Sequence, residues 1–462
     1  MDVKNMETNT PAAEKSGFGS RIGFILAAAG SAVGLGNIWR FPYLAAKYGG
    51  GIFLLIYLIL AVTFGFSLMI TEIAIGRRTG KSVIGAYESI NKRFSPLCWL
   101  AAFVPVIITP YYCVIGGWVL KYLVTFASGA GTTAGGDGTF FSGFIGAAGE
   151  PAMYFLIFLL ATAAVVMLGV EKGIERISKF MMPVLVLLTI GIAVYTLTLD
   201  GAAAGLKYYL LPNLKGFTFP MLLKTVAAAM GQLFYSMSLA MGIMVTYGSY
   251  MRKEDSLEQS VRQIEIFDTG IAILAGLIIV PAVFVFSGGD ASALNAGPSL
   301  MFITLPNVFG SMTGGQIVGT VFFVLVALAA MTSSISLMET VVSIIMEKFR
   351  MKRIPACLIT VLVCLLLGML SVLGYSAWSN VKLIGMQFLD FFDFISNNIM
   401  MPVVALLTCI LIGWVVKPKY VEDEVLESQK NFRARMLLSV MLRFVCPVCM
   451  VIILLTPFVT DI

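Results

Sequence analysis

The chain has 462 residues, of which 59% are hydrophobic and 12% are charged. Soluble domains average about 45–50% apolar and about 25% charged residues, so this composition excludes an ordinary soluble protein. The apolar residues occur in repeated blocks of about 20, the length that an α-helix needs to cross the hydrocarbon core of a bilayer. The sequence therefore predicts an all-α polytopic membrane protein. Its expected partners are the lipid bilayer and a small molecule, and no nucleic acid.

The chain contains no histidine, which excludes Ser-His-Asp and Cys-His catalysis and histidine metal ligands. Cys446 and Cys449 form a CxxC, but Pro447 and the apolar surroundings argue against a redox or zinc site. No phosphate-binding loop of the form GxxxxGK(S/T) occurs, which argues against ATP-driven transport. We therefore expect no catalytic residues and no enzyme.

Eleven membrane spans are expected from the apolar blocks. They lie at about 20–44, 51–76, 98–127, 151–170, 176–199, 218–249, 262–287, 314–347, 355–374, 383–416 and 436–459. Of the 31 Lys and Arg residues, 23 lie near the N-terminus and in the loops after even-numbered spans. The loops on the other side hold four of them, Lys47, Lys207, Lys215 and Lys382. The positive-inside rule then predicts a multi-pass protein of the cell (inner) membrane, with a cytoplasmic N-terminus and an extracytoplasmic C-terminus.

Two of the expected spans contain residues that interrupt a helix. Residues 30–37 read GSAVGLGN, and residues 231–242 read GQLFYSMSLAMG. These are the first and sixth spans, which correspond if the first ten form two repeats of five. A matched pair of interrupted helices in two halves points to a transporter's binding site at the bilayer midplane. The alternative is that the glycines only allow close packing of helices.

Interrupted helices can bind charged groups at membrane depth. The N-terminal ends of the half-helices offer N–H groups and partial positive charge to an anion, and the C-terminal ends offer carbonyl groups to a cation. One site could therefore hold a carboxylate, an ammonium group and a metal cation together.

Four segments resemble the neurotransmitter:sodium symporter family, in its bacterial eleven-span form. They are RIGFILAAAGSAVGLGNIWRFPYLAAKYGGGIF (21–53), TEIAIGRRTG (71–80), QLFYSMSLAMGIMVTYGSY (232–250) and MTSSISLMET (331–340). The resemblance implies a five-plus-five inverted repeat with unwound first and sixth helices, and sodium-coupled symport of amino acids or related amines.

The resemblance also implies how the chain is divided. The expected parts are a cytoplasmic N-terminal segment (1–19), the first repeat (20–199), an external connection (200–217), the second repeat (218–416), a cytoplasmic linker (417–435), and an eleventh helix with an external C-terminus (436–462).

Two sodium ions are implied, each held by oxygen atoms, which hard cations prefer. The first site would use the Ala32 carbonyl and the side chains of Asn37, Ser236 and Asp268. The second would use the carbonyls of Gly30, Val33 and Ala329 and the hydroxyls of Thr332 and Ser333.

Asp268 is the most informative single residue. A carboxylate inside a span costs about 2.5–3.5 kcal/mol or more and is a functional-site hypothesis by default. Many relatives carry Asn here and need a nearby chloride, so a permanent Asp268 charge predicts chloride independence. The alternative is that Asp268 lies near the cytoplasmic end of its span.

The substrate site implied by the resemblance is weakly polar. Its expected residues are Ser31, Ala32, Leu35, Gly36, Ile108, Tyr112, Tyr235, Ser236, Ser238, Met241, Ser334 and Leu337. None of these side chains is acidic, and the Asp that monoamine transporters typically place near Gly34 is missing. The expected substrate is therefore a neutral, hydrophobic or aromatic L-amino acid.

Gates are expected on both sides of this site. Arg40 would pair with Asp393, or with Asp390 one turn earlier, in the outer gate with Tyr112 and Tyr235. On the cytoplasmic side Lys15 would pair with Glu347, aided by Arg21 and Tyr250.

Several alternatives stay open at this stage. A channel would need a continuous polar stripe, which the spans lack, and a membrane enzyme would need nucleophile, base or metal groups. Within the transporters, the runner-up substrate is an organic solute such as a betaine. The sequence does not choose among Leu, Met, Tyr and Trp, does not give the oligomeric state, and does not decide whether protons are counter-transported.

Overall fold

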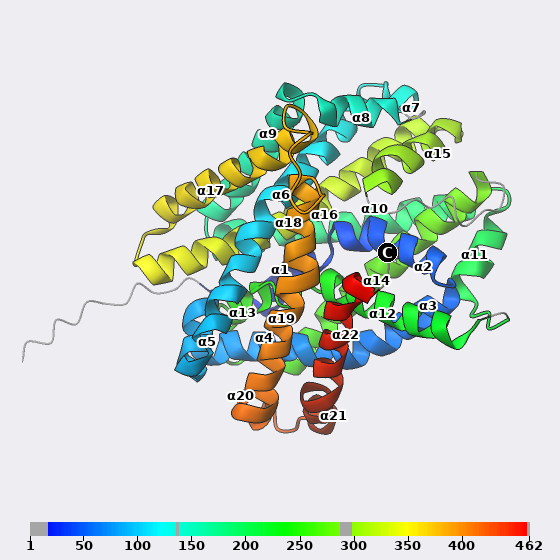
Figure 1. The fold of residues 1–462 in the computed structure, drawn as a ribbon. Coiled ribbons are helices and arrows are strands. Elements are labelled where there is room, and N and C mark those ends of the chain that lie inside the picture. Colours follow the sequence, from blue (N-terminus) through cyan, green and yellow to red (C-terminus); the bar gives the residue numbers. More distant parts are fainter. Residues whose placement is uncertain (1–16, 135–137, 216, 287–297, 460–462) are drawn as a thin grey trace, which may run out of the picture.

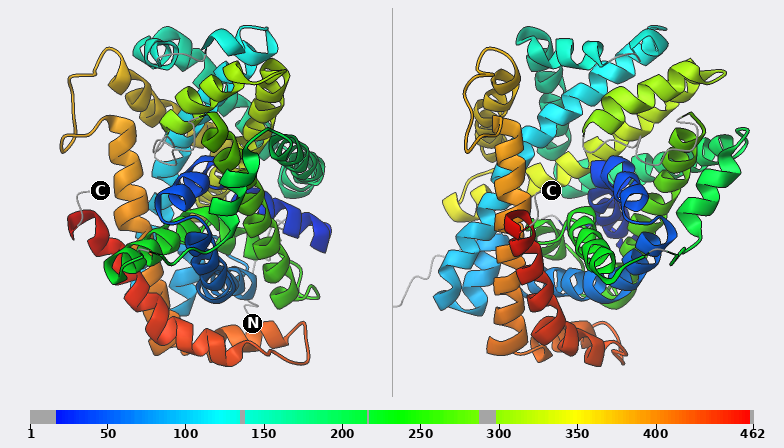
Figure 2. Two further views of the ribbon diagram at one scale, coloured as in Figure 1. Left: turned by 90° about the vertical axis from the view of Figure 1, so that its right-hand side faces the viewer. Right: turned by 45° about the vertical axis from the view of Figure 1, so that its right-hand side comes forward.

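The structure is a computed structural model that describes residues 17–134, 138–215, 217–286 and 298–459. In these residues the regular secondary structure is helical, apart from two isolated β-bridges. The helices form one bundle in which α20 and α21 lie at one end and α7 and α8 at the other (Figures 1 and 2).

The first half of the chain contains eleven α-helices. They are α1 (Arg21–Ala32), α2 (Phe41–Lys47), α3 (Gly51–Leu60), α4 (Phe66–Thr79), α5 (Val83–Ile90), α6 (Ser95–Ala127), α7 (Gly131–Ala134), α8 (Thr139–Gly146), α9 (Gly149–Met167), α10 (Arg176–Leu197) and α11 (Ala202–Leu210). Short π-helical segments join several of them, including η1 (Gly36–Arg40) and η2 (Ala61–Gly65).

The second half contains the remaining helices. They are α12 (Phe219–Ser236), α13 (Ile243–Gly248), α14 (Leu257–Phe286), α15 (Leu305–Ser311), α16 (Gly315–Phe349), α17 (Arg353–Tyr375), α18 (Phe388–Asp393), α19 (Met401–Ile410), α20 (Lys419–Leu426), α21 (Arg435–Val440) and α22 (Cys446–Val459). A π-helical segment, η7 (Phe394–Met400), joins α18 to α19.

Within the described residues, nine helices are long and apolar enough to cross a membrane alone. A tenth span arises if the pair Arg21–Ala32 and Gly36–Lys47, bent by 53°, is taken as one. The expected sixth span is not among them, because residues 237–242 separate α12 from α13. The all-α polytopic fold with broken first and sixth helices is confirmed, whereas the count of eleven is not.

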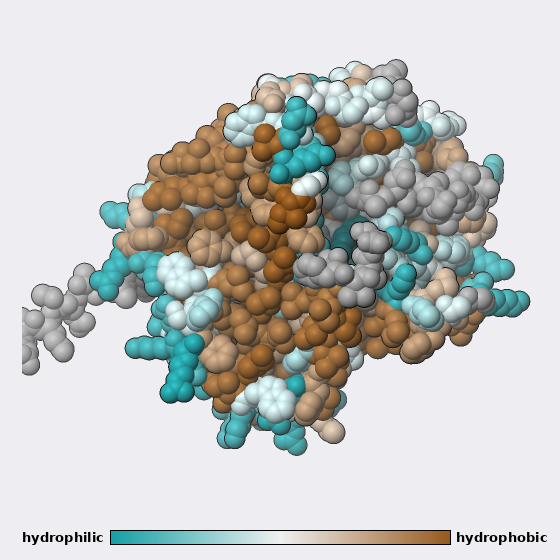
Figure 3. Space-filling model, viewed as in Figure 1, coloured by the Kyte–Doolittle hydropathy of each residue, from teal (hydrophilic) through white to brown (hydrophobic). Residues whose placement is uncertain are grey.

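The first helix lies at the centre of the bundle. α1 packs against α10, α14 and α16, and most of its residues are buried. Small residues make this possible: a Cβ atom on Gly23 would lie 2.1 Å from the Glu175 carboxylate. Large apolar side chains are instead exposed on the outer helices, including Leu187 of α10 and Leu366 of α17. They produce the broad hydrophobic surface of Figure 3, as expected of helices that contact lipid.

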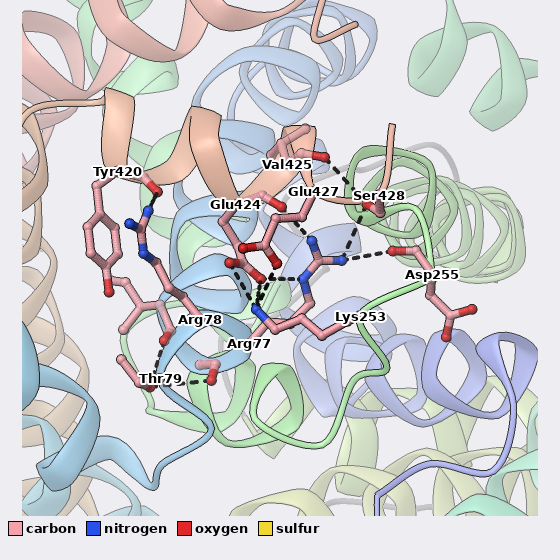
Figure 4. A network of polar contacts seen from close by, with 12 residues as sticks. Arg77, Arg78, Thr79, Lys253, Asp255, Tyr420, Glu424, Val425, Glu427 and Ser428 are labelled. Carbon is pink, nitrogen blue, oxygen red and sulfur yellow. Dashed lines mark hydrogen bonds and ion pairs between the residues drawn. The ribbon is translucent and has the colours of Figure 1, made fainter. Parts of the chain in front are cut away.

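The segment 417–435 is attached to the bundle by a buried ion pair. Arg77 at the end of α4 contacts Glu424 of α20 at 2.6 Å, and both side chains are 0% exposed. Arg77 also donates to the Asp255 carbonyl at 2.8 Å, and Lys253 contacts Glu424 at 2.8 Å (Figure 4). This network joins α4, the turn before α14, and α20.

We predict that Arg77→Ala destabilises the protein by about 3–5 kcal/mol, because it leaves the Glu424 carboxylate buried with only Lys253 as a cationic partner. Unfolding of the purified protein in detergent would measure the loss. Arg78→Ala is the matched control: Arg78 is the next residue and also cationic, but it is exposed and donates to the Tyr420 carbonyl. A loss as large for Arg78→Ala as for Arg77→Ala would contradict the assigned role of the buried pair.

Candidate functional site

The two helix breaks lie against one another at the centre of the bundle. α1 ends at Ala32, and Val33 leaves the helix with φ −72° and ψ 96°. In the second break Ser238 and Ala240 have φ values of 53° and 58°, a region that residues other than glycine rarely adopt. The Ser238 hydroxyl donates to the Ser31 carbonyl at 3.0 Å, which joins the two breaks directly.

A buried carboxylate supports the second break. The Oε1 atom of Glu72, on α4, accepts a hydrogen bond from the Ala240 amide at 2.7 Å. Without this acceptor the amide would be unpaired at membrane depth, which costs several kcal/mol. Glu72 was not among the residues expected at the site, although an acidic residue inside a span was a signal that could have found it.

One oxygen cluster gathers around Asp268 on α14. The Asp268 carboxylate accepts from the Asn37 amide at 2.7 Å and from the Ser236 hydroxyl at 2.9 Å. The Asn37 Oδ1 atom in turn accepts from the Gly34 amide at 3.1 Å. The Asp268 side chain is fully buried, so the structure places it inside the bundle, with three of the four residues expected at the first sodium site in mutual contact.

A second oxygen cluster lies where the end of α1 meets α16. The Ser333 hydroxyl donates to the Ser31 carbonyl at 3.1 Å and reaches the Val33 carbonyl at 3.5 Å. The Thr332 hydroxyl donates to the Ala329 carbonyl at 3.0 Å, and its Cβ lies 3.2 Å from the position of a Cβ on Gly30. All five residues expected at the second sodium site therefore lie together. The oxygen groups of this cluster are carbonyls and hydroxyls, the kind that a hard cation prefers.

A small cavity lies between the two breaks, beside the Asp268 cluster. Its lining residues are Ser31, Ala32, Gly34, Leu35, Gly36, Asn37, Ile108, Tyr112, Tyr235, Ser236, Ser238, Met241, Ile243, Ser333 and Leu337. None of these side chains is charged. The Tyr112 hydroxyl accepts a hydrogen bond from the Leu35 amide at 3.3 Å, so this side chain of α6 contacts the unwound backbone of the first break.

Eleven of the twelve expected substrate residues line this cavity. The exception is Ser334, whose hydroxyl donates to the Ala330 carbonyl at 2.8 Å and contacts the Thr162 hydroxyl at 3.3 Å. Gly34 and Ile243 line the cavity without having been expected there. Ile243 follows the second break directly, and that position was the signal available for it.

The expected outer-gate residues stand near one another without closing an ion pair. The Arg40 guanidinium lies 5.6 Å from the centre of the Tyr235 ring and donates to the Gly231 carbonyl. Asp393 accepts hydrogen bonds from Tyr111 at 3.2 Å and Asn397 at 2.6 Å. Asp390, the alternative partner of Arg40, accepts from Tyr375 at 3.2 Å. The pairing of Arg40 stays a prediction.

The structure describes contacts for three of the four expected cytoplasmic-gate residues. Tyr250 donates to Glu339 at 2.8 Å, and Glu339 forms an ion pair with Arg353 at 2.6 Å. Arg21 donates to Ser260 at 3.2 Å, and Glu347 accepts from the Ser82 amide. Lys15 lies outside the described residues. Glu339 and Arg353 were not expected at this gate.

Comparison with known proteins identifies the family. The model of the sodium:neurotransmitter symporter family matches residues 15–130 and 141–461. The chain belongs to this family. It is 36% identical to the uncharacterized sodium-dependent transporter YhdH of Bacillus subtilis (strain 168), over 94% of this chain and 96% of that protein. It is 34% identical to an uncharacterized sodium-dependent transporter of Haemophilus influenzae, over 89% of this chain and 91% of that protein.

A solved structure has the same fold. The crystal structure of MhsT in complex with L-phenylalanine superposes with a TM-score of 0.84 at 36% identity, covering 96% of this chain and 99% of that one. As a member of the family, this chain is a sodium-dependent symporter of a small molecule in a membrane, and not an enzyme.

We predict that Gly36→Ala removes most sodium-dependent thermal stabilisation of the symporter. A Cβ at Gly36 would lie 2.6 Å from Cδ1 of the Tyr235 ring, so the ring or the unwound backbone must move. Thermal unfolding with and without sodium would show the loss. Gly270→Ala is the matched control, because a Cβ there meets nothing within 4 Å although Gly270 lies two residues from Asp268. Equal effects of the two substitutions would contradict the prediction.

Proposed function

We propose that this protein couples the import of a neutral, hydrophobic or aromatic L-amino acid to the entry of sodium. The observation that carries the proposal is the uncharged cavity between the two helix breaks, which lies beside the Asp268 oxygen cluster. A zwitterion has one charge of each sign, so it needs no charged side chain in its pocket if helix ends and an ion supply the countercharges.

The substrate would be held by backbone groups at its charged end. Leu35 and Gly36 stand at the start of the π-helical segment η1, so their amides, with the Tyr112 hydroxyl, suit a carboxylate. The carbonyls of Ala32, Tyr235 and Ser236 and the Ser238 hydroxyl suit the ammonium group. The side chains of Ile108, Met241 and Leu337 would then surround an apolar substrate side chain. MhsT, a similar structure, holds L-phenylalanine.

A binding screen of the twenty L-amino acids against the purified protein tests this proposal. We expect sodium-dependent thermal stabilisation by apolar and aromatic amino acids and none by charged ones. Stabilisation by a betaine and by no amino acid would favour the runner-up substrate class and contradict the proposal.

Chloride independence follows from the buried Asp268 charge. The carboxylate supplies the negative charge that an anion would otherwise bring to a buried cation site.

We predict that Asp268→Asn weakens sodium-dependent substrate binding and makes binding depend on chloride. The substrate affinity of the variant should be about tenfold or more higher in chloride buffer than in chloride-free buffer. Glu265→Gln is the matched control, because Glu265 is also buried and acidic and lies on α14, one turn earlier. If the Asn variant binds substrate equally in both buffers, with unchanged sodium affinity, charge replacement is wrong.

We further propose that two sodium ions enter with each substrate. With a zwitterionic substrate each cycle then moves two net charges, and a potential of 100 mV contributes about 4.6 kcal/mol. An inside-negative potential should therefore accelerate uptake into proteoliposomes. Proton counter-transport through Asp268 would return one of these charges.

The second oxygen cluster gives the sharpest test of the ion count. Thr332→Val or Ser333→Ala should lower the Hill coefficient for sodium from about two towards one, because each removes a hydroxyl ligand. Ser334→Ala is the control, since its hydroxyl lies outside the cavity and should leave the coefficient unchanged. A coefficient near one in the unmodified protein would exclude the two-sodium proposal.

Alternating access would be controlled by gates at the two ends of the site. We propose that residues 20–199 and 218–416 form the two inverted repeats, in a protein of the inner membrane with its N-terminus inside. In the state that is closed to the outside, Arg40 would form an ion pair with Asp393.

We predict that Arg40→Ala impairs transport and that Arg40→Asp combined with Asp393→Arg restores part of it. Uptake assays on matched expression levels would measure both. Rescue by Asp390→Arg instead would reassign the partner, and no rescue by either would exclude both carboxylates.

A further inference from the structure

A basic cleft lies away from the candidate site. Its walls come from the junction of α2 and α3, from α11 and the segment after it, and from the first turns of α12. The cleft has a volume of about 890 Å³, and Lys47, Lys207, Lys215 and Lys224 line it without any Asp or Glu. The cleft lies just before the start of the 29-residue span Gly51–Thr79. Arg77 lies near the end of that span, so the cleft and the Arg77–Glu424 network lie at its opposite ends.

No described carboxylate is paired with the four lysines of the cleft. None of them forms an ion pair with a carboxylate within the described parts of the chain. Lys121, another lysine in the outer half of the bundle, is by contrast paired with Glu150 at 2.5 Å. Because like charges gathered around one cleft repel one another, an anion bound among them would be stabilised.

Hydrogen bonds and ring contacts hold the walls of the cleft together. Gly50 and Pro212 form a β-bridge, and the Thr225 hydroxyl donates to the Tyr48 carbonyl at 3.4 Å. The Lys47 ammonium lies 5.6 Å and 5.5 Å from the ring centres of Tyr43 and Tyr48. The cleft is therefore formed by contacts among three separate parts of the chain, and it does not depend on flexible lysine side chains alone.

Exposed apolar side chains flank the lysines. Leu214 and Phe219 are 72% and 70% exposed, and Leu211, Met221 and Leu223 are also exposed. Hydrophilic residues gather at the right-hand edge of Figure 3, over α11 and the start of α12, next to hydrophobic ones. Cationic groups beside exposed apolar groups match a molecule with an anionic head and apolar tails.

We propose that this cleft binds the phosphodiester headgroup of an anionic phospholipid, with the acyl chains lying along the apolar residues beside it. Lysine binds phosphate well as a point charge, and the volume falls in the range of about 300–1,000 Å³ typical of ligand sites. Three of the four lysines in the loops opposite the basic side of the membrane meet here, although the positive-inside rule disfavours lysine on that side.

The location places this lipid beside the two interrupted helices of the symporter. α2 and α12 are the half-helices beyond the first break and before the second, and both contribute to the cleft. A headgroup bound there would hold these two half-helices together. Lipid binding itself does not rest on the identity of the transported substrate.

The test compares three probes on the purified full-length protein: phosphatidylglycerol, phosphatidylcholine and inorganic phosphate. Native mass spectrometry would count bound lipids, and thermal unfolding would measure stabilisation. We expect phosphatidylglycerol to bind and stabilise the protein, less so at high salt, and the other two probes to have little effect. Combining Lys47→Gln, Lys207→Gln, Lys215→Gln and Lys224→Gln should weaken phosphatidylglycerol binding by about tenfold or more.

Lys382→Gln is the matched control, because Lys382 is the fourth lysine of the same loops but does not line the cleft. It should leave lipid binding unchanged. Retained sodium-dependent stabilisation shows that the fourfold variant folds. If it does not fold, the pairs Lys47→Gln with Lys207→Gln and Lys215→Gln with Lys224→Gln should each weaken binding by about threefold.

Three outcomes would overturn the proposal. The first is that phosphatidylglycerol does not bind the unmodified protein. The second is that it binds the folded lysine variants as well as it binds the unmodified protein. The third is that Lys382→Gln weakens its binding as much as the lysine variants do. Inorganic phosphate that binds as tightly as the lipid, and is lost in the lysine variants, would show that the cleft binds a soluble anion and overturn the lipid assignment.

Discussion

The structure depends on one constraint: backbone groups released where a helix breaks inside a membrane must find partners there. A helix that crosses a bilayer normally satisfies its own N–H and C=O groups. Short stretches of the first and sixth spans lack these hydrogen bonds within the helix, and the surrounding helices supply the missing partners. Glu72 accepts from the Ala240 amide, Tyr112 accepts from the Leu35 amide, and Ser333 donates to the Ser31 carbonyl. The central position of α1, packed against α10, α14 and α16, follows from this need.

The same constraint creates the site. Unwound backbone that is not fully paired within the protein can pair with a ligand instead, and its half-helix ends carry partial charges of both signs. Asp268 adds one full negative charge beside these ends, held by Asn37 and Ser236. In the proposed mechanism, sodium ions complete this arrangement, so the affinity for substrate and the affinity for sodium are coupled through shared groups.

Charged residues elsewhere divide into paired and unpaired groups. At one end of the bundle, the buried ion pair of Arg77 and Glu424 connects α4 to α20, which are distant in sequence. Arg353, at the start of α17, pairs with the buried Glu339 of α16. Such pairs contribute little net stability when complete, but breaking one is costly, so they favour particular arrangements of helix ends. The lysines of the basic cleft have no acidic partner among the described residues, so an anionic ligand from outside the chain suits them.

The sequence by itself determined the class of the protein and most of the residues that line the candidate cavity. Composition predicted a polytopic helical bundle, and the glycine and serine interruptions predicted the two breaks. Eleven of the twelve residues that the resemblance implied for the substrate site line the cavity. The predictions of the bundle and of the breaks succeeded because the length of an apolar block and the presence of helix-breaking residues affect the local segment directly. Tertiary structure alone decided what depends on distance: that Ser334 bonds back to its own helix, that Glu72 supports the second break, and that Glu339 binds Arg353. It also brought four lysines from three segments into one cleft. Hydrophobic periodicity can be read from the sequence, whereas which residues become neighbours in space depends on how the helices pack.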